Sequence, residues 1–395
     1  MRIGIDYTSA ARQGGGIGRY TRELVTAVIA EGADSYCEAA PQACQHRFVL
    51  FAGTQGLGDR WKTEAARLRR VAAPGQLTLR QVPLTDEWMA RIWQRLRLPI
   101  PAELITGRLD LFYAPDFLLP PLLTARRKLI TIHDLSFIRH PETFTPQLRR
   151  YLGSAVPRSA RAADHILTDS HATRQDVIDL LQVSPERVST LHLGVSAAFR
   201  AEPEPEERAD LERLYDLSGA PFVLAVGTVQ PRKNYRRLID AVELIRERVD
   251  VDLVIVGGRG WLSDDLVEAA AHRPWVHLPG FAADTDLPAL YRQAEVLAYP
   301  SLYEGFGLSP LEAMACGTPV VASTVSSVPE AVGDAGLLVD PLDVDGLANA
   351  IERAITDSAL RSELRARGFA RAATFTWARA ARGWWKIVEE SLARS

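Results

Sequence analysis

Short runs of Val, Ile and Leu alternate with amphipathic segments of helical length along almost the whole chain. This alternation is typical of parallel sheets covered by helices on both faces. Helices are predicted notably over residues 17–30, 147–162 and 171–182. Strands are predicted near residues 2–6, 47–52, 110–114, 128–133, 164–168, 187–192, 221–227, 252–257, 275–278, 295–299, 319–322 and 336–339. Each half of the chain therefore fits an α/β fold with a doubly wound parallel sheet.

A change in composition near the middle of the chain marks a domain boundary. Residues 201–210, AEPEPEERAD, combine prolines with carboxylates and offer no apolar face to a core, which is typical of a linker. We predict an N-terminal domain over 1–197, a linker over 198–215 and a C-terminal domain over 216–375. The last segment, 376–395, has the pattern of an amphipathic helix with three tryptophans and can pack back on the first domain.

The two domains differ in charge. The chain has 46 Lys and Arg against 49 Asp and Glu, a formal charge of -3. Residues 1–197 hold 25 of the basic and 19 of the acidic residues, net +6, which leaves net -9 for the remainder. The basic excess is concentrated in residues 60–108, with ten Lys and Arg against four Asp and Glu. These basic residues form no recognised base-reading motif, so we expect no nucleic-acid partner.

Composition also limits the number of domains and the cellular compartment that the protein can have. With 395 residues, 47% of them hydrophobic and 24% charged, the chain is long enough for two or three globular domains. No run of eighteen apolar residues predicts a membrane span, and the opening RIGID does not resemble a signal peptide. Cys37, Cys44 and Cys316 are too few for a disulfide framework and lack zinc-site spacing. We therefore predict a cytoplasmic protein.

A basic amphipathic segment in the first domain has two interpretations. Residues 86–98 include WMARIWQRLRLP. Apolar side chains follow one helical face, and Arg91 and Arg95 lie elsewhere. The apolar set is Trp88, Met89, Ile92, Trp93 and Leu96. Such a helix can lie on an anionic membrane, as a peripheral contact, or cover the core of its domain, and both interpretations stay open.

Two strand-to-helix loops of the first domain carry candidate binding residues. In RQGGGIGRYTREL, Gly14, Gly15 and Gly16 can take positive φ, and the following helix start can offer N–H groups to an anion. The full dinucleotide fingerprint is missing, so NAD binding is disfavoured. In KLITIHDLSFIRHPE, a buried strand ends at His133 and Asp134, where ligands of open α/β sheets bind. A histidine satisfied by a loop carbonyl is the alternative.

A basic pair opens a helix in the second domain. In FVLAVGTVQPRKNYRRLIDA, Arg232 and Lys233 precede the predicted helix. Cations at a helix N-terminus oppose its dipole, so their placement is unfavourable unless an anion is present. A diphosphate fits that requirement, and a pair of solvated charges is the alternative.

The segment SLYEGFGLSPLEAMACGTPVVAS is the most specific motif in the chain. Its glycine loop leads into a predicted helix, so the amides of Phe306, Gly307 and Leu308 can point at a ligand. Glu304 and Glu312 stand on either side of this loop. Because carboxylates repel phosphate, these two glutamates are better suited to accept hydrogen bonds from ribose or sugar hydroxyls.

A short acidic motif, Asp284-Thr285-Asp286, has the DxD form of metal-dependent transferases. It directly precedes the predicted helix LPALYRQA, so helix capping is the better explanation. With Arg232 and Lys233 available for a diphosphate, we expect no metal and no cofactor.

In this order and spacing, the motifs GGGIGRY, TIHDL, GTVQPRKN, EGFGLSPLEAMACGTPVVAS and PEAVGDAGLLVDP resemble glycosyltransferase family 4 over nearly the whole chain. The family consists of retaining enzymes with the GT-B fold, in which two Rossmann-like domains face a central cleft. The resemblance implies that Glu304 contacts the donor sugar, Arg232 with Lys233 the diphosphate, and His133 the surroundings of the transferred sugar. These four are the catalytic candidates.

The resemblance also implies a set of donor-binding residues. Glu312 would contact the ribose, and Gly15 with Gly16 would approach donor phosphate or acceptor. The whole set is Gly15, Gly16, Asp134, Gly227, Gly305, Phe306, Gly307, Leu308 and Glu312.

Within the family, the motifs look most like the bacterial mannosyltransferases of polysaccharide assembly. This implies transfer of mannose from GDP-mannose to a saccharide or lipid-linked acceptor. Donors such as UDP-glucose or UDP-N-acetylglucosamine stay open, as do a sugar-nucleotide epimerase and a catalytically silent sugar-nucleotide-binding protein. Near His133 the sequence offers no carboxylate nucleophile besides Asp134, which favours retention through a short-lived ion pair.

Overall fold

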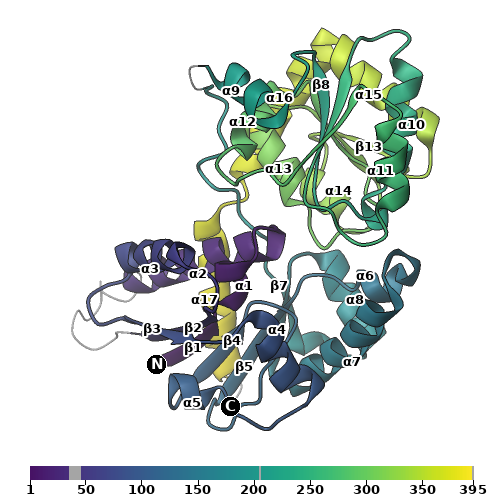
Figure 1. Cartoon of the computed structure of the whole chain (residues 1–395). Coiled ribbons are helices and arrows are strands. Elements are labelled where there is room, and N and C mark those ends of the chain that lie inside the picture. The colour runs from purple at the N-terminus through teal and green to yellow at the C-terminus, as the bar shows by residue number, and fades with distance from the viewer. Residues whose placement is uncertain (35–45, 204–205, 394–395) are drawn as a thin grey trace. The chain divides into compact units, whose positions relative to one another are not determined.

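The computed structural model describes residues 1–34, 46–203 and 206–393 (Figure 1). Cys37 and Cys44 lie outside the described residues. By its internal contacts the chain divides into two units, each assembled from separate stretches. The first unit comprises Met1–Leu135, Arg150–Gly194 and Trp377–Ser395, and the second comprises Ser136–Arg149 and Val195–Thr376.

The first unit is built on a seven-stranded sheet. Its strand order is β3-β2-β1-β4-β5-β6-β7, and all neighbouring strands are parallel. The strands are β1 (Arg2–Asp6), β2 (Arg47–Gly53), β3 (Leu77–Val82), β4 (Leu111–Ala114), β5 (Arg127–Ile132), β6 (His165–Thr168) and β7 (Val188–Thr190). Side chains of β4 and β6 are buried along the whole strand, as expected where helices cover both faces of a parallel sheet.

The helices of the first unit lie on both faces of this sheet (Figure 1). They are α1 (Thr8–Arg12), α2 (Gly16–Asp34), α3 (Asp59–Val71), α4 (Asp86–Ala90), the π-helical turn η1 (Arg91–Arg95), α5 (Glu103–Thr106), α8 (His171–Leu181), the 3₁₀ turn η3 (Pro185–Arg187) and α17 (Trp377–Ala393). Helix α7 (Pro146–Ala162) crosses the boundary between the two units in the sequence.

The second unit has a six-stranded parallel sheet of order β10-β9-β8-β11-β12-β13. Its strands are β8 (Phe222–Val226), β9 (Asp252–Val256), β10 (Val276–Gly280), β11 (Val296–Tyr299), β12 (Val320–Ser323) and β13 (Leu337–Val339). Its helices and turns are α6 (Ser136–Arg139), η2 (Pro141–Thr143), α9 (Glu207–Tyr215), η4 (Pro231–Lys233), α10 (Tyr235–Ile245), α11 (Asp264–Ala271), α12 (Leu287–Gln293), α13 (Leu308–Ala315), α14 (Val328–Val332), α15 (Val344–Thr356) and α16 (Ser358–Ala373). Two parallel α/β units confirm the predicted fold class.

The C-terminal helix α17 packs against α2 of the first unit. The Trp385 indole donates a 3.1 Å hydrogen bond to the Val28 carbonyl, and Trp384 is completely buried. A Cβ atom on Gly32 would lie 2.7 Å from the Trp385 ring, so the absence of a side chain at this position permits the close approach. Burial of two tryptophans gives this helix a large apolar contact with the unit.

Three elements differ from the sequence expectations. Strand β3 was not predicted, because it is an edge strand whose side chains are only partly buried. Helix α9 falls within the predicted linker, and there Leu211 is buried while Glu207 pairs with Arg292. The Asp286 side chain does not cap α12; instead one of its oxygens accepts a 2.5 Å hydrogen bond from the Tyr215 hydroxyl.

The segment 86–98 combines features of both interpretations. Met89 is buried and Trp93 is half-buried, whereas Trp88 and Leu96 are 49% and 64% exposed. Across the described part of the chain, no helix is both long and apolar enough to cross a membrane.

Candidate active site

A buried ion-pair cluster lies at the carboxyl ends of β8 and β11 in the second unit. Arg232 and Lys233 belong to η4, between β8 and α10, and Glu304 follows β11. Lys233 Nζ lies 2.7 Å from Glu304 Oε1, and Arg232 Nη1 lies 3.0 Å from Glu304 Oε2. All three residues are buried. Two cations and one carboxylate leave this cluster with a net positive charge.

The electrostatics of the cluster keep Glu304 ionised. Burial disfavours its charged form, but Arg232 and Lys233 outweigh this effect and lower the pKa of Glu304 to about 2. The carboxylate is therefore a hydrogen-bond acceptor at any physiological pH. Removing one partner would leave a buried charge uncompensated, which is strongly unfavourable.

Two buried phenols lie at this cluster, of which Tyr299 contacts the lysine and Tyr235 the neighbouring Gly227. Lys233 Nζ donates a 3.3 Å hydrogen bond to the Tyr299 hydroxyl and lies 4.8 Å from the centre of that ring. The Tyr235 hydroxyl donates to the Gly227 carbonyl at 3.2 Å. Burial is the largest influence on the Tyr299 hydroxyl and raises its pKa well above the ordinary value, so the phenol stays neutral.

Gly227 is required by the same arrangement. Its φ is +147°, and a Cβ atom there would lie 2.8 Å from Lys233 Cε. Any side chain would therefore displace the lysine and strain the backbone. Of the residues predicted to bind the donor, Gly227 thus acts by leaving room for Lys233.

The loop before α13 is held by two serines that the sequence did not single out. Ser326 Oγ accepts the Glu304 N–H at 2.8 Å. Ser327 Oγ donates to the carbonyls of Glu304 and Phe306 at 2.8 and 2.9 Å. These bonds fix the loop through Gly305 without using the Glu304 carboxylate.

Helix α13 begins at Leu308, directly after this loop. Gly307 is its N-cap residue at φ +124° and has no side chain to cap the helix. The N-terminus of α13 therefore presents its positive dipole end without a capping side chain, a typical anion site.

Glu312, on the same helix, is buried against α12. Its Oε2 accepts a 3.0 Å hydrogen bond from the Tyr291 hydroxyl, and the residue is 2% exposed. Its predicted contact with a ribose stays a prediction.

In the first unit, His133 follows β5 and lies in a polar and aromatic enclosure. Its Nδ1 is 2.7 Å from Asp169 Oδ2, and its Nε2 is 3.0 Å from the Pro115 carbonyl. Tyr20 and Phe117 contact the imidazole edge-to-face, with ring centres 4.7 and 5.4 Å away. Both ring nitrogens face acceptors, so the doubly protonated imidazolium fits this geometry.

The charge of His133 follows from its partner. Burial disfavours the cation, but Asp169 outweighs it and raises the pKa of His133 to about 9. Asp169 follows β6, the strand next to β5, and sequence analysis missed it. The signal was available, because a polar residue at the carboxyl end of a neighbouring parallel strand reaches the same sheet edge. Asp134, next to His133, is half-buried.

Gly15 and Gly16 stand at the exposed start of α2. A Cβ atom on either would meet no heavy atom within 4 Å. By contrast, a Cβ on Gly18 would lie 2.2 Å from the Gln13 carbonyl oxygen. Packing therefore explains Gly18 and leaves open space beside Gly15 and Gly16, where a ligand can approach the backbone.

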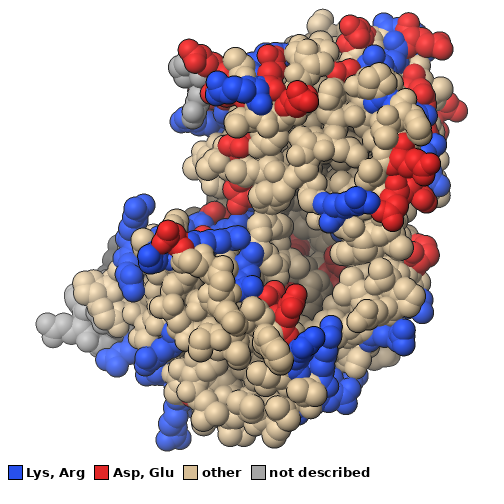
Figure 2. All heavy atoms as spheres, viewed as in Figure 1, with Lys and Arg blue, Asp and Glu red and all other residues tan. Residues whose placement is uncertain are grey.

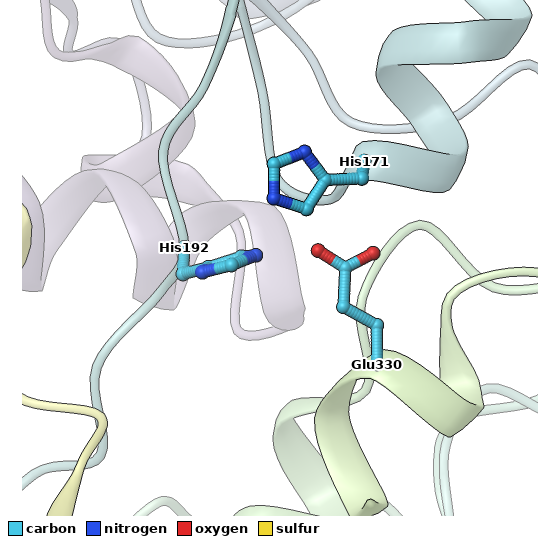
Figure 3. Close-up of side chains that lie close together, drawn as sticks. All are labelled: His171, His192 and Glu330. Carbon is cyan, nitrogen blue, oxygen red and sulfur yellow. The ribbon is translucent and has the colours of Figure 1, made fainter.

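A pair of histidines also lies at the carboxyl edge of the first sheet. His171 begins α8, and His192 follows β7; their rings are perpendicular with centres 5.4 Å apart (Figure 3). His171 Nδ1 is 3.2 Å from the Thr190 hydroxyl. Figure 3 also labels Glu330, from α14 of the second unit. Sequence analysis singled out none of the three.

Two doubly wound units, one of which has a buried Arg-Lys-Glu cluster beside an uncapped helix start, define the GT-B class of glycosyltransferases. Solved structures of this class match along the whole chain. HepE of Anabaena, in complex with UDP and glucose, matches with a TM-score of 0.70 and 18% identity over 99% of this chain and 100% of its own. Sucrose-phosphate synthase of Thermosynechococcus elongatus matches with a TM-score of 0.73 and 22% identity over 100% of this chain and 100% of its own.

Sequence comparison gives the family. The family model "Glycosyltransferase Family 4" matches residues 14–199, and "Glycosyl transferases group 1" matches 220–357. The O-antigen chain mannosyltransferase B of Escherichia coli is 39% identical over 272 residues, 68% of this chain and 71% of that protein. The serotype-specific mannosyltransferase WbdA of E. coli is 32% identical over 260 residues, 63% of this chain but 32% of WbdA. The chain belongs to glycosyltransferase family 4, and it is a glycosyltransferase.

Proposed function

We propose that the protein is a retaining α-mannosyltransferase that moves mannose from GDP-mannose to a saccharide or lipid-linked acceptor in polysaccharide biosynthesis. The observation that carries this proposal is the 39% identity to O-antigen chain mannosyltransferase B, which extends over most of both chains. The similarity to WbdA supports the same sugar, although this chain spans about a third of WbdA.

The chemistry of the second unit supports transfer from a nucleoside diphosphate sugar. As the sugar leaves, negative charge develops on the diphosphate and positive charge on the sugar ring. Arg232 and Lys233 can stabilise the diphosphate together with the N-terminus of α13. A bound diphosphate would take over part of their charge from Glu304, which then accepts hydrogen bonds from sugar hydroxyls.

We further propose that no metal ion is needed and that retention follows from attack on the same face from which the diphosphate departs. Arg232 and Lys233 supply the two positive charges that a divalent cation would otherwise bring to the diphosphate. Rates that do not change when EDTA is added would support the first statement, and rates that depend on added Mg²⁺ or Mn²⁺ would contradict it.

The donor is tested by a thermal-shift and product screen. We expect GDP-mannose to raise the melting temperature and to give a new α-linked product with a mannose-containing acceptor, because a ligand that binds only the folded state stabilises it. UDP-glucose and UDP-N-acetylglucosamine are the comparison donors. Product from a UDP-sugar and none from GDP-mannose would overturn the assignment of the donor, and a β-linked product would overturn retention.

We also propose that the first unit lies on an anionic membrane through an apolar and basic strip, residues 88–100. In this strip Trp88, Leu96, Leu98 and Ile100 are 40 to 64% exposed, and Arg91, Arg95 and Arg97 are exposed beside them. In the view of Figure 2, Lys and Arg side chains are frequent on this unit. Exposed apolar side chains among arginines are typical of an interfacial contact with anionic lipid.

A further inference from the structure

The second unit contains a small pocket at the edge of its sheet opposite to the Arg232–Lys233–Glu304 cluster. Ala294 and Pro319 line this pocket, and the strands that follow them, β11 and β12, are parallel neighbours. The pocket therefore lies at the amino ends of these strands, whereas the cluster lies at carboxyl ends. Its volume is about 250 Å³. This is slightly below the range of about 300–1,000 Å³ that is usual for drug-sized ligands, so the pocket suits a small one.

Arginines are the charged side chains that line this pocket among the described residues. Arg292 belongs to the last turn of α12, and Arg361 and Arg365 belong to α16. The two arginines of α16 are four positions apart and therefore lie on one face of that helix. No acidic side chain of the described residues is part of the lining. Because its charged groups are all guanidiniums, the pocket is suited to an anion.

The Arg292 side chain is fixed by a buried ion pair. Its Nε donates to the two oxygens of Glu207 at 3.1 and 3.0 Å, and its Nη1 donates to the Arg200 carbonyl at 3.0 Å. The side chains of Arg292 and Glu207 are 7% and 5% exposed. Arg292 therefore forms a rigid wall of the pocket, and Glu207 balances its charge.

The uncompensated positive charge of the pocket comes from α16. Arg361 is paired with Glu295 at 2.6 Å, but Glu295 is not part of the lining. Arg365 is exposed, and its Nη2 lies 3.4 Å from the place that a Cβ atom would take on Gly317, in the pocket wall. Within the described part of the chain, Arg365 forms no ion pair and no hydrogen bond. Its guanidinium is thus available to a ligand.

The end of α13, which forms another wall, does not repel an anion. Burial raises the pKa of Cys316 to about 12, so its thiol stays neutral. Three carbonyls in the last turn of α13 accept hydrogen bonds from the N–H groups of residues 316–318; they are those of Glu312, Ala313 and Met314. These bonds satisfy the groups that would otherwise carry the negative end of the helix dipole.

A phosphate group fits this pocket better than a carboxylate does. Its oxygens accept hydrogen bonds in several directions, as donors from two different helices require, whereas a carboxylate presents two oxygens in one plane. We propose that the pocket binds a phosphate group, either as inorganic phosphate or as part of a small phosphorylated metabolite, with Arg361 and Arg365 as its charged contacts. A phosphate bound here would be additional to the donor diphosphate, whichever nucleotide sugar the protein uses.

Equilibrium dialysis of the full chain with radiolabelled inorganic phosphate tests this site. GDP is added in excess to occupy Arg232 and Lys233, which would otherwise bind phosphate themselves. We expect phosphate to bind in the presence of GDP, and Arg365→Ala to weaken this binding about tenfold or more, as when a hydrogen bond to a charged group is lost. Arg367→Ala, on the same helix and paired with Glu363, is the matched control and should bind phosphate as the wild type does.

The test also works if GDP is not a ligand. If GDP leaves the melting temperature unchanged, the wild type and Arg365→Ala are compared with phosphate alone. A tenfold loss of phosphate affinity would still support the pocket, while the failure of GDP to bind would count against the proposed donor.

Arg365→Ala should fold, because the side chain is exposed and has no partner among the described residues. If its melting temperature falls nonetheless, Arg361→Lys takes its place. Lysine keeps the positive charge beside Glu295 but lacks the planar fork of donors, so phosphate affinity should fall severalfold.

Competing ligands identify the source of the phosphate. Competition by mannose 1-phosphate at the same concentration as unlabelled phosphate would support a phosphorylated metabolite as the ligand, and competition by inorganic phosphate alone would support the free ion. Stronger competition by citrate than by phosphate would overturn the choice of a phosphate group. Equal phosphate binding by the wild type and Arg365→Ala would overturn the site itself.

Discussion

At the scale of single residues, the proposed function gives Glu304 a double role, because it neutralises the two cations that we propose bind the diphosphate. Its two carboxylate oxygens are divided between Lys233 and Arg232. The carboxylate would therefore compete with the proposed donor, and it offsets the repulsion between two buried cations. A residue in this position affects binding and transfer in opposite directions.

This competition gives a prediction for Glu304→Gln. The variant keeps the shape of the side chain but removes its charge, so we expect GDP to bind more tightly. The transfer rate should fall about a hundredfold or more, as when one electrostatic partner is removed from an active site. Calorimetric titration with GDP and initial-rate measurements check the two effects. Glu295→Gln, on a partly exposed carboxylate paired with Arg361, is the control. An unchanged kcat would contradict the role of Glu304.

Gly227 allows a second test at this scale. Gly227→Ala places a methyl group against Lys233 at a φ that alanine rarely adopts, so we expect a loss of about 1–3 kcal/mol in the free energy of unfolding. Gly258→Ala, where a Cβ would meet nothing within 4 Å, should lose much less. Urea unfolding measures both. Equal stability of the two variants would show that the space beside Lys233 is not needed.

The sequence could predict these site residues only in part. Arg232, Lys233 and Glu304 were predictable one by one, because each follows a strand at the edge where α/β sheets bind ligands. The ion pairing among them was not predictable, because Lys233 and Glu304 are 71 residues apart in the sequence. Their contact depends on the order of strands in the sheet.

At the scale of elements, runs of apolar residues predicted the buried strands reliably. The same pattern was weaker in elements that are only partly buried. Strand β3 exposes several side chains at the sheet edge and gave no apolar run. Helix α9 looked like linker because one of its buried contacts is the Glu207 carboxylate, which pairs with Arg292 far along the chain. A helix rich in charged residues can be well packed when the oppositely charged partner comes from a distant part of the sequence.

The strip over residues 88–100 yields a prediction at this scale. Trp88→Ala combined with Leu96→Ser should reduce binding to vesicles that contain anionic lipid, because the change removes apolar area from the proposed contact. Leu262→Ser, a similarly exposed leucine in the second unit, is the control and should bind as the wild type does. Co-sedimentation measures binding. Equal binding to anionic and zwitterionic vesicles, or no effect of the double change, would contradict the proposed membrane contact.

At the scale of the whole molecule, the fold was predictable because two long series of buried strands can form little else than parallel sheets. The charge difference between the two parts of the chain was equally visible. The second part is acidic overall although it holds Arg232 and Lys233, which we propose bind the donor. The basic excess of the first part therefore needs another explanation, and the proposed membrane contact offers one. The division into units was harder to foresee, because residues 136–149 belong by contacts to the second unit.

Global stability should depend on pH through His133. Its pKa is raised to about 9 in the folded protein, so its contribution is complete below its ordinary pKa near 6.5 and is lost as the pH rises through 9. A shift of this size corresponds to about 3 kcal/mol. Asp169→Asn removes the carboxylate that holds the proton and should flatten the stability curve between pH 7 and 10. Urea unfolding at each pH measures it, with the exposed Asp179→Asn as control. A slope equal to that of the wild type would contradict the assignment.

The position of α17 has a consequence for how the protein is made. Trp384 and Trp385 belong to the core of the first unit, yet they are synthesised after the whole of the second unit. The second unit is almost entirely synthesised in between and can close its own sheet first, whereas domains usually fold in the order of synthesis. The first unit must therefore wait, with α2 uncovered, until α17 has been synthesised. Removing α17 would harm the unit whose sheet is encoded first.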